Sequence, residues 1–476
     1  MTHPIVRSLR AFKPLAIAAL LASGGALAED LAPGEATFGV KLKLAGLAEG
    51  DRGLGRNDLD GAPVDPDGET AEGYLDVQPA LFWRVSEDWD LFVRLQGFLP
   101  SGEIVVFDEE RPRRTESFAA VREAWVAYHG LTSYPGEMIK IGRQRLREDD
   151  GTWWDRDAEA IHWTFDSTLL QAHVGLASEL HTGRTGSEEL PSSQRDRGYA
   201  FAGISRQWHA EHFIGARAAH AFDYAGPDDP ATDERDPKLS ERQYTWIGLF
   251  AHNDYFGQPD RAGLYYWSQY NFLFGTREDV VLSGDPLSAT TVERDVRSWA
   301  IDGGARLHFD MPLSIGFAIA VADGGGDQAR SKNFEQTGLH SNRSRFTGTR
   351  SLIYRYNEAL RPELSNLRMA SAFVSVPLRR FDASLVYHWI ERNQNDEPIV
   401  ADGIDVQPVN NDADIGEGID LVLGTYFGTT PQSQIDDDDD LRSNIRLRGS
   451  LFRPGTAYGN SLDDQYRVIL ETTLWF

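Results

Sequence analysis

Apolar and polar residues alternate with a period of two through much of this chain. In the final segment, residues 466–476, Val468 and Leu470 fall on one face of an extended strand, and Arg467 and Glu471 fall on the other. Successive side chains of a strand point to opposite faces, so the pattern predicts a strand with one apolar and one charged face. Charged side chains are costly in a packed core unless they are paired, but they cost little beside a water-filled lumen.

The same alternation recurs in other segments, including 161–165, 170–176, 299–309 and 313–322. Counting such segments gives about eighteen strands, an even number within the range of single-chain outer-membrane barrels. The chain contains no run of apolar residues long enough for a membrane-spanning helix. We therefore predict an all-β fold, a transmembrane antiparallel β-barrel.

The predicted connections alternate between long and short. If Phe476 is periplasmic, the long polar loops lie outside the cell and short turns such as 167–168 and 310–312 lie in the periplasm. This is the usual asymmetry of outer-membrane barrels, whereas a β-sandwich or a soluble propeller predicts none. The long extracellular loops are expected near 48–72, 99–117, 147–157, 178–196, 223–240, 276–294, 324–363, 392–416 and 454–464.

One predicted periplasmic turn, near 429–441, is long and carries the acidic run Asp436–Asp440. Such a run favours a solvated segment. The alternative is a flap that repels a polyanion or is held by a divalent cation such as calcium.

The first 28 residues have the features of a cleaved secretory signal. Three basic residues precede a short apolar run, residues 15–21, and Ala26 and Ala28 form a small-x-small cleavage site. The run is too short to span a bilayer as a helix, which weighs against an N-terminal membrane anchor. We predict that residues 29–476 form a single barrel domain in the bacterial outer membrane.

Composition narrows the function. The net charge is −26, and removing the three basic residues of the signal lowers it to −29, which argues against a nucleic-acid partner. The absence of cysteine excludes disulfides and thiolate sites. No motif connects the loose candidates for catalysis, so we predict no catalytic residue, no cofactor and no metal site. These candidates are His162, His173, His308 and Ser384.

Basic residues nevertheless occupy predicted inward faces. Lys43 alternates with Leu42 and Leu44, and Arg446 and Arg448 flank Leu447. Rings of Arg or Lys are the usual device of anion-selective pores, and a low-dielectric wall focuses their field even in an acidic protein. The alternative is that these residues pair with inward acids and only brace the barrel.

Two segments break the alternation. Arg145 shares a face with apolar Ile141, and Arg122 shares a face with the expected lipid-facing positions of 120–128. Either Arg145 lies beyond the lipid zone or a bulge at Gly142 switches the face, and Arg122 requires a kink in its strand.

Several long stretches resemble the alginate export family of outer-membrane porins. The strongest is 131–177, which contains IGRQRLREDDGTWWDRD, and the second is 334–367. IRLRGSLFRPGTAYG at 445–459 and DASLVYH at 382–388 also fit, and weaker similarity covers most of the mature chain. The resemblance implies a barrel of about eighteen strands with a positively charged conduit for a uronate polymer.

The resemblance also implies conduit residues where the motifs match. Lys43, Arg122, Arg145, Arg343 and Arg446 are similar to the family's conduit bases, and Asp155 is similar to an acidic residue that faces them. Gln78 and Leu352 stand where the family pattern has arginines, and Gly186 stands where it has an acid. The family further implies gating by the loop near 99–117 and by the turn near 429–441.

We therefore predict an anion-selective porin that exports alginate from the periplasm to the cell exterior. The expected partners are alginate or a similar anionic polysaccharide, outer-membrane lipid and lipopolysaccharide, and periplasmic polysaccharide-secretion proteins. The main alternative is a porin for small acids or sugars. An outer-membrane enzyme and an adhesive surface barrel are further alternatives, which the missing catalytic motif and the inward arginines disfavour.

Overall fold

The structure is a computed structural model. It describes residues 31–50, 70–101, 104–105, 114–115, 117–185, 190, 194–226, 240–253, 259, 261–282, 289–327, 329–395, 397–404, 406–427 and 443–476. The predicted signal, the acidic run Asp436–Asp440, and most of the loop near 99–117 lie outside these residues.

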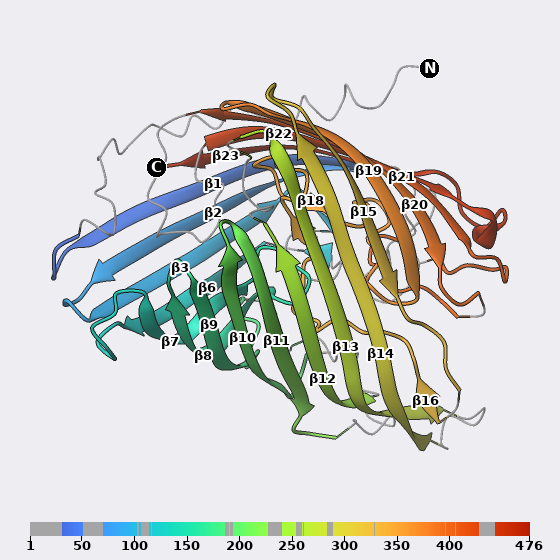
Figure 1. Ribbon diagram of the computed structural model, residues 1–476, viewed down its shortest axis with the longest axis horizontal. Helices are drawn as coiled ribbons and strands as arrows, with labels where there is room; N and C mark the ends of the chain where they lie inside the picture. The colour runs from blue at the N-terminus through green and yellow to red at the C-terminus, as the bar shows by residue number, and fades with distance from the viewer. Residues whose placement is uncertain are drawn as a thin grey trace.

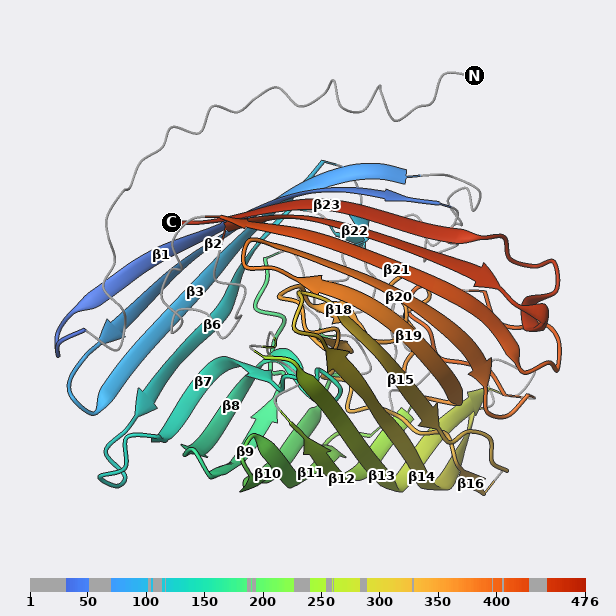
Figure 2. The ribbon, with the colours of Figure 1, turned by 45° about the horizontal axis from the view of Figure 1, so that its top comes forward.

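Eighteen of the described strands form one closed antiparallel barrel (Figure 1, Figure 2). The first strand, β1, pairs with the last, β23, from Lys41 opposite Trp475 to Glu49 opposite Arg467, which closes the wall. The predicted fold class and strand number are thus confirmed. The wall strands are β1 (Ala36–Glu49), β2 (Thr70–Arg84), β3 (Trp89–Pro100), β6 (Phe118–Tyr128), β7 (Glu137–Arg147), β8 (Asp155–Asp166), β9 (Leu170–Ser178), β10 (Arg197–His209), β11 (His212–Asp223), β12 (Ser240–His252), β13 (Gly263–Leu282), β14 (Ala289–His308), β15 (Ser314–Ala322), β19 (Leu367–Pro377), β20 (Phe381–Arg392), β21 (Asp414–Phe427), β22 (Ser443–Pro454) and β23 (Gln465–Trp475).

Short elements accompany the wall. The strand β16 (Arg330–Ser331) pairs in parallel with β14. Two separate pairs are β4 (Ile104–Val105) with β5 (Arg114–Thr115), and β17 (Arg343–Ser344) with β18 (Ile353–Tyr354). A single turn of 3-10 helix, η2, covers Thr456–Tyr458. In the part of the chain that the structure describes, no helix is long and apolar enough to cross a membrane.

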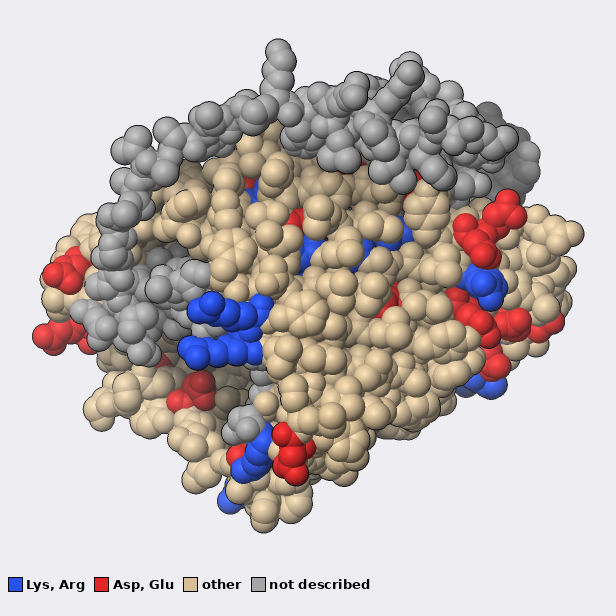
Figure 3. Space-filling model, turned by 90° about the horizontal axis from the view of Figure 1, so that it is seen from above, with Lys and Arg blue, Asp and Glu red and all other residues tan. Residues whose placement is uncertain are grey.

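The alternating pattern places apolar side chains outside and charged side chains inside. Leu176 and Leu470 are 58% and 54% exposed on the outer face, whereas inward Arg306 and Arg467 are 0% and 4% exposed. On the face that Figure 3 shows, uncharged residues form a broad band and most acidic side chains lie at its margins. An apolar outer band with polar residues inside is the arrangement that a lipid bilayer requires of a barrel.

The two ends of the barrel differ in their connections. One end carries short turns, for example at 167–169 and 378–380, and we call it the short-turn end. The opposite, long-loop end carries the longer connections. The predicted loop near 276–294 is wrong in extent, because β13 and β14 stay paired as far as Leu282 and Ala289. A strand that extends beyond the lipid needs no apolar face, so its polar sequence resembled a loop.

The prediction that residues 324–363 form an external loop is also wrong. Residues 332–366, the lumen insert, fold inside the barrel, where β18 lies in Figure 2, whereas β16 pairs with the extended part of β14. Their partners come from the inner faces of several wall strands: Ser375 donates to the carbonyl of Thr347 at 2.5 Å, and Asn357 donates to Asp420 at 3.0 Å. Buried apolar residues such as Phe346 stabilise the insert in this position.

The β7–β8 hairpin likewise leaves the wall. Beyond Arg143, β7 no longer pairs with β6, and before Glu159, β8 does not pair with β9. The chain after β9 takes their place beside β6: the amide of Val121 donates to the carbonyl of Gly183 at 2.9 Å, and Ala120 forms an antiparallel bridge with Arg184. Residues 144–158, the hairpin tip, therefore lie within the barrel.

Candidate substrate conduit

The inward hairpin tip explains why Arg145 shares a face with lipid-facing Ile141. Four consecutive residues of β8, Asp155 to Ala158, are buried, whereas a wall strand exposes every second residue to lipid. Arg145 contacts Asp155 across the hairpin, with 2.6 Å between Nη2 and Oδ1. The predicted conduit residues Arg145 and Asp155 are thus brought together inside the barrel.

The bend occurs at Gly142, which has a φ of +126°. A Cβ atom there would lie 2.3 Å from the carbonyl oxygen of Ala124 on β6. Glycine is the residue that tolerates both the positive φ and this close approach. The face switch is therefore a bend of the whole hairpin rather than a bulge within the wall.

Arg122 turns inward by a different device, a β-bulge. In the β3–β6 pairing, Arg94 faces Glu123 and Leu95 faces Val121, so Arg122 is the extra residue. Its Nε lies 2.6 Å from Asp157 Oδ2 on the hairpin tip. The kink expected in this strand is confirmed, and Arg122 joins the group formed by Arg145 and Asp155.

Lys43 and Arg446 converge on one carboxylate. Glu471 of β23 lies 3.2 Å from Lys43 Nζ on β1 and 3.0 Å from Arg446 Nη1 on β22. Arg448, also on β22, lies 3.5 Å from the same carboxylate. One acid is therefore the shared partner of three basic side chains from the wall.

Arg343 belongs to the lumen insert and contacts Glu358 at 3.5 Å. Glu358 also binds Arg361 and lies 4.0 Å from Arg467, which in turn contacts Glu49 at 3.0 Å. Burial alone would raise the pKa of Glu358, but the surrounding arginines, Arg361 foremost and then Arg343, hold it below the ordinary value. Glu358 is therefore a permanent anion inside the barrel.

These groups form a connected lining. Arg448, which contacts Glu471, also donates to the carbonyl of Leu352 in the insert at 2.6 Å. Asp155 of the hairpin tip accepts a hydrogen bond from Ser341, two residues before Arg343. The wall, the hairpin tip and the lumen insert therefore each contribute conduit residues.

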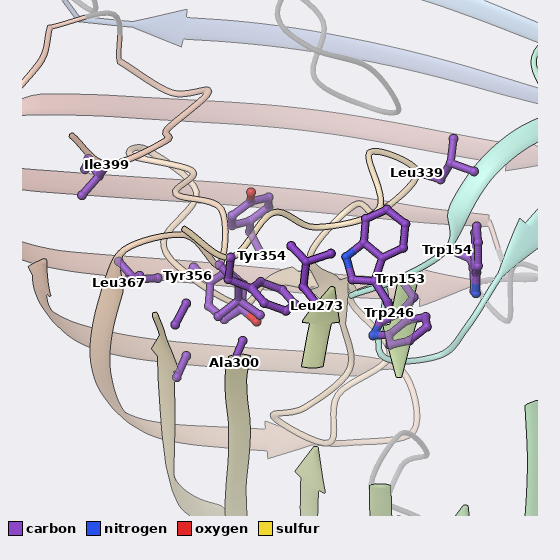
Figure 4. Packing of buried hydrophobic residues seen from close by; sticks show 14 of the residues in the cluster. Trp153, Trp154, Trp246, Leu273, Ala300, Leu339, Tyr354, Tyr356, Leu367 and Ile399 are labelled. Carbon is purple, nitrogen blue, oxygen red and sulfur yellow. The ribbon is translucent and has the colours of Figure 1, made fainter. Parts of the chain in front are cut away.

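An apolar cluster fixes the hairpin tip against the insert and the wall. Figure 4 shows Trp153 and Trp154 of the tip beside Leu339 of the insert and Trp246 of β12. The amide of Asp155 donates to the carbonyl of Leu339 at 2.6 Å. Burial of this much aromatic surface holds the tip rigidly enough to position charged groups.

The end of the tip is anchored on β11 by Arg217. Arg217 contacts Glu148 and lies 2.9 Å from Asp150. Burial raises the pKa of Glu148 to about 7, although Arg217 opposes this effect. Burial acts in the same direction on Asp150, but Arg217 and the amide of Thr152 hold its pKa below the ordinary value.

The structure describes two of the three positions at which this sequence differs from the family's expected conduit residues. Gln78 donates to Asp76 at 2.8 Å, and Leu352 contributes its carbonyl oxygen to Arg448. Gly186 lies outside the described residues. The sequence prediction missed Glu358 and Arg361 because it placed their segment outside the barrel.

Comparison with known proteins agrees with this architecture. A sequence model of the family described as "Alginate export" matches residues 58–468. The chain is 36% identical to the alginate production protein AlgE of Pseudomonas aeruginosa, over 98% of this chain and 97% of that one. It is 30% identical to the protein of the same name in Azotobacter vinelandii, over 96% and 97% of the two chains.

Solved outer-membrane proteins share the fold at low identity. OccAB1 of Acinetobacter baumannii has a TM-score of 0.55 at 10% identity, covering 93% of this chain and 96% of that one. OpdK of Pseudomonas aeruginosa, solved with vanillate, has a TM-score of 0.51 at 12% identity, covering 95% and 100%. These likenesses show an outer-membrane β-barrel fold. With the sequence matches, they establish that the chain belongs to the alginate export family, whose members are outer-membrane export barrels and not enzymes.

Proposed function

We propose that this protein exports alginate, or a similar polyuronate, from the periplasm to the cell exterior through an anion-selective lumen. The observation that carries the proposal is a set of inward basic side chains that share carboxylate partners. Among the contacts described above, six basic side chains share three carboxylates. The bases are Lys43, Arg343, Arg361, Arg446, Arg448 and Arg467, and the acids are Glu49, Glu358 and Glu471. Low-dielectric walls focus such a field, so a polyanion is attracted although the whole chain carries a net charge of −26.

Movement of the polymer follows from exchange of ion pairs. A uronate carboxylate that replaces Glu471 beside Lys43 or Arg446 forms the same kind of contact that it displaces. Breaking a buried pair without replacement costs about 3–5 kcal/mol, whereas exchange keeps Lys43 and Arg446 paired. Several exchangeable sites then allow the chain to slide, with Arg122, Arg145 and Asp155 forming the hairpin side of the path.

The experiment is single-channel recording of the purified protein in planar bilayers, with ion selectivity taken from reversal potentials in a salt gradient. The native protein is expected to prefer anions and to be blocked by polyuronate. Arg343→Ala with Arg446→Ala should reduce both effects several-fold. Arg453→Ala is the matched control, because this side chain is 65% exposed at the end of β22.

Cation preference without polyuronate block would contradict the proposal. Permeation of small acids together with a lack of polyuronate block would favour the alternative of a small-solute porin.

A further inference from the structure

A second charged cavity lies beside the conduit, between the lumen insert and the inner faces of β10, β12 and β13. Its volume is about 230 Å³. This is below the range of roughly 300–1,000 Å³ that is common for drug-sized ligands, so the cavity suits a single sugar ring better than a packed polymer. We call it the side pocket.

The charge of the side pocket repeats the pattern of the conduit. Arg242 and Arg277 both contact Glu335 of the insert, at 3.2 Å and 3.0 Å. Burial alone would raise the pKa of Glu335, but Arg242 and then Arg277 hold it below the ordinary value. Both planar guanidinium groups thus contact Glu335, which a uronate carboxylate of the same shape can replace, and Arg277 also contacts Asp279 at 2.6 Å.

Aromatic rings and amides complete the lining. Trp246 donates to the carbonyl of Glu335 at 2.7 Å, and Tyr244 donates to its carboxylate at 3.0 Å. These bonds fix both rings beside the arginines, and the amide of Asn333 lines the same cavity. Fixed aromatic surfaces next to a few polar groups are what a sugar ring with an acidic substituent requires.

The side pocket adjoins the proposed conduit. Tyr354, which lines the pocket, is the cross-strand partner of Arg343, a conduit residue. Arg361 also lines the pocket, lies 5.3 Å above the ring of Tyr354 and contacts Glu358. Arg361 therefore belongs to both the conduit and the side pocket, so a polymer bound along the conduit can reach the side pocket.

We propose that the side pocket is a binding subsite for one uronate unit of the exported polymer. Arg242 and Arg277 bind its carboxylate in exchange for Glu335, and its ring packs against Tyr244 and Trp246. This inference rests on the proposed export of a polyuronate. Holding one unit beside the conduit lengthens the time that the chain stays in the barrel.

The test uses bilayer recordings with a trimeric uronate oligosaccharide, and maltotriose as the neutral probe. Each is added separately to either side of the membrane. Arg242→Gln with Arg277→Gln is expected to shorten uronate block events about tenfold, a loss of about 1.4 kcal/mol. Asn333→Asp is the second variant, because it adds a negative charge to the pocket without removing either arginine. It should also shorten the block.

The outcomes separate the two proposals. Unchanged block lengths in both variants, with the native protein anion-selective and blocked, would overturn the side pocket alone. Equal block by maltotriose would overturn recognition of the carboxylate. A native protein that prefers cations and shows no block would overturn the export proposal itself. Native gel mobility before and after heating identifies variants that form the barrel.

Discussion

The guanidinium group of Arg122 lies 2.6 Å from the carboxylate of Asp157, although β7 separates their strands in the order of the wall. The contact exists because Arg122 occupies a bulge and Asp157 belongs to the inward hairpin tip. Two local departures from regular pairing therefore create one charged surface inside the barrel. Features of this kind recur where a barrel directs side chains toward a functional site.

Gly142 should be a sensitive backbone position of this arrangement. Gly142→Val is expected to lower stability by about 2 kcal/mol or more, because the side chain meets the backbone of β6 at a positive φ. The temperature at which the native band disappears from gels measures the change. Gly97→Ala on β3 is the control, since an added Cβ there meets no atom within 4 Å. Equal midpoints for the two variants would mean that the bend does not depend on glycine.

Much of the fold was predictable from sequence because lipid imposes a period of two on every wall strand. The alternating pattern did not identify segments that have no contact with lipid. Beyond the lipid, β13 and β14 carry polar residues on both faces, so they resembled a loop. Inside the barrel, the lumen insert has no lipid-facing side at all.

The site was only partly predictable for the same reason. Lys43 and Arg446 were identified from alternation, because they lie on regular wall strands. Glu358 and Arg361 were missed, although one signal was available: residues 346–364 contain buried Phe346, Tyr356 and Leu360, which is unusual for a solvated loop. The pairing of each conduit base with an acid depends on three-dimensional proximity and has no signature along the chain.

The variant Glu471→Gln tests whether the basic residues around Glu471 bind the exported anion or only stabilise the barrel. Removing this charge releases Lys43, Arg446 and Arg448 from a shared partner, so the lumen becomes more positive. We expect a several-fold increase in anion over cation permeability and longer block by polyuronate, measured in planar bilayers. Asp464→Asn is the control, because this acid is 56% exposed at the long-loop end. Lower barrel stability with unchanged selectivity would instead support a purely bracing role for the three bases.

The stability of the barrel should fall as the pH rises, because Glu148 of the hairpin tip loses its proton. Burial raises the pKa of Glu148 from 4.5 to about 7, so its contribution to stability is complete below pH 4.5 and is lost as the pH rises through 7. The neighbouring charges are Asp149, Asp150 and Arg217, and the lowered pKa of Asp150 keeps it ionised over this window. The loss is at most about 3.5 kcal/mol, from about 1.4 kcal/mol per pKa unit.

The measurement is the thermal midpoint of the barrel at about pH 5 and pH 8, for the native protein and for Glu148→Gln. The native midpoint should fall more than that of the variant, which lacks the titrating carboxyl. Parallel behaviour of the two proteins would show that the pH dependence arises elsewhere.

The lumen insert should limit the conductance of the barrel. The amide of Arg355 donates to the carbonyl of Asn342 at 2.8 Å, so residues 343–354 leave and return at nearly the same place. Replacing them with a two-residue Gly-Ser link removes β17 and β18 without touching the pairing of the wall strands. Arg306 and Asp382, which contact this segment, then become accessible to water in the lumen, where their charges are tolerated. We expect a several-fold higher single-channel conductance and shorter polyuronate block, because Arg343 is lost with the segment. A barrel that inserts normally but keeps the native conductance would place the narrowest point elsewhere, between the hairpin tip and the wall.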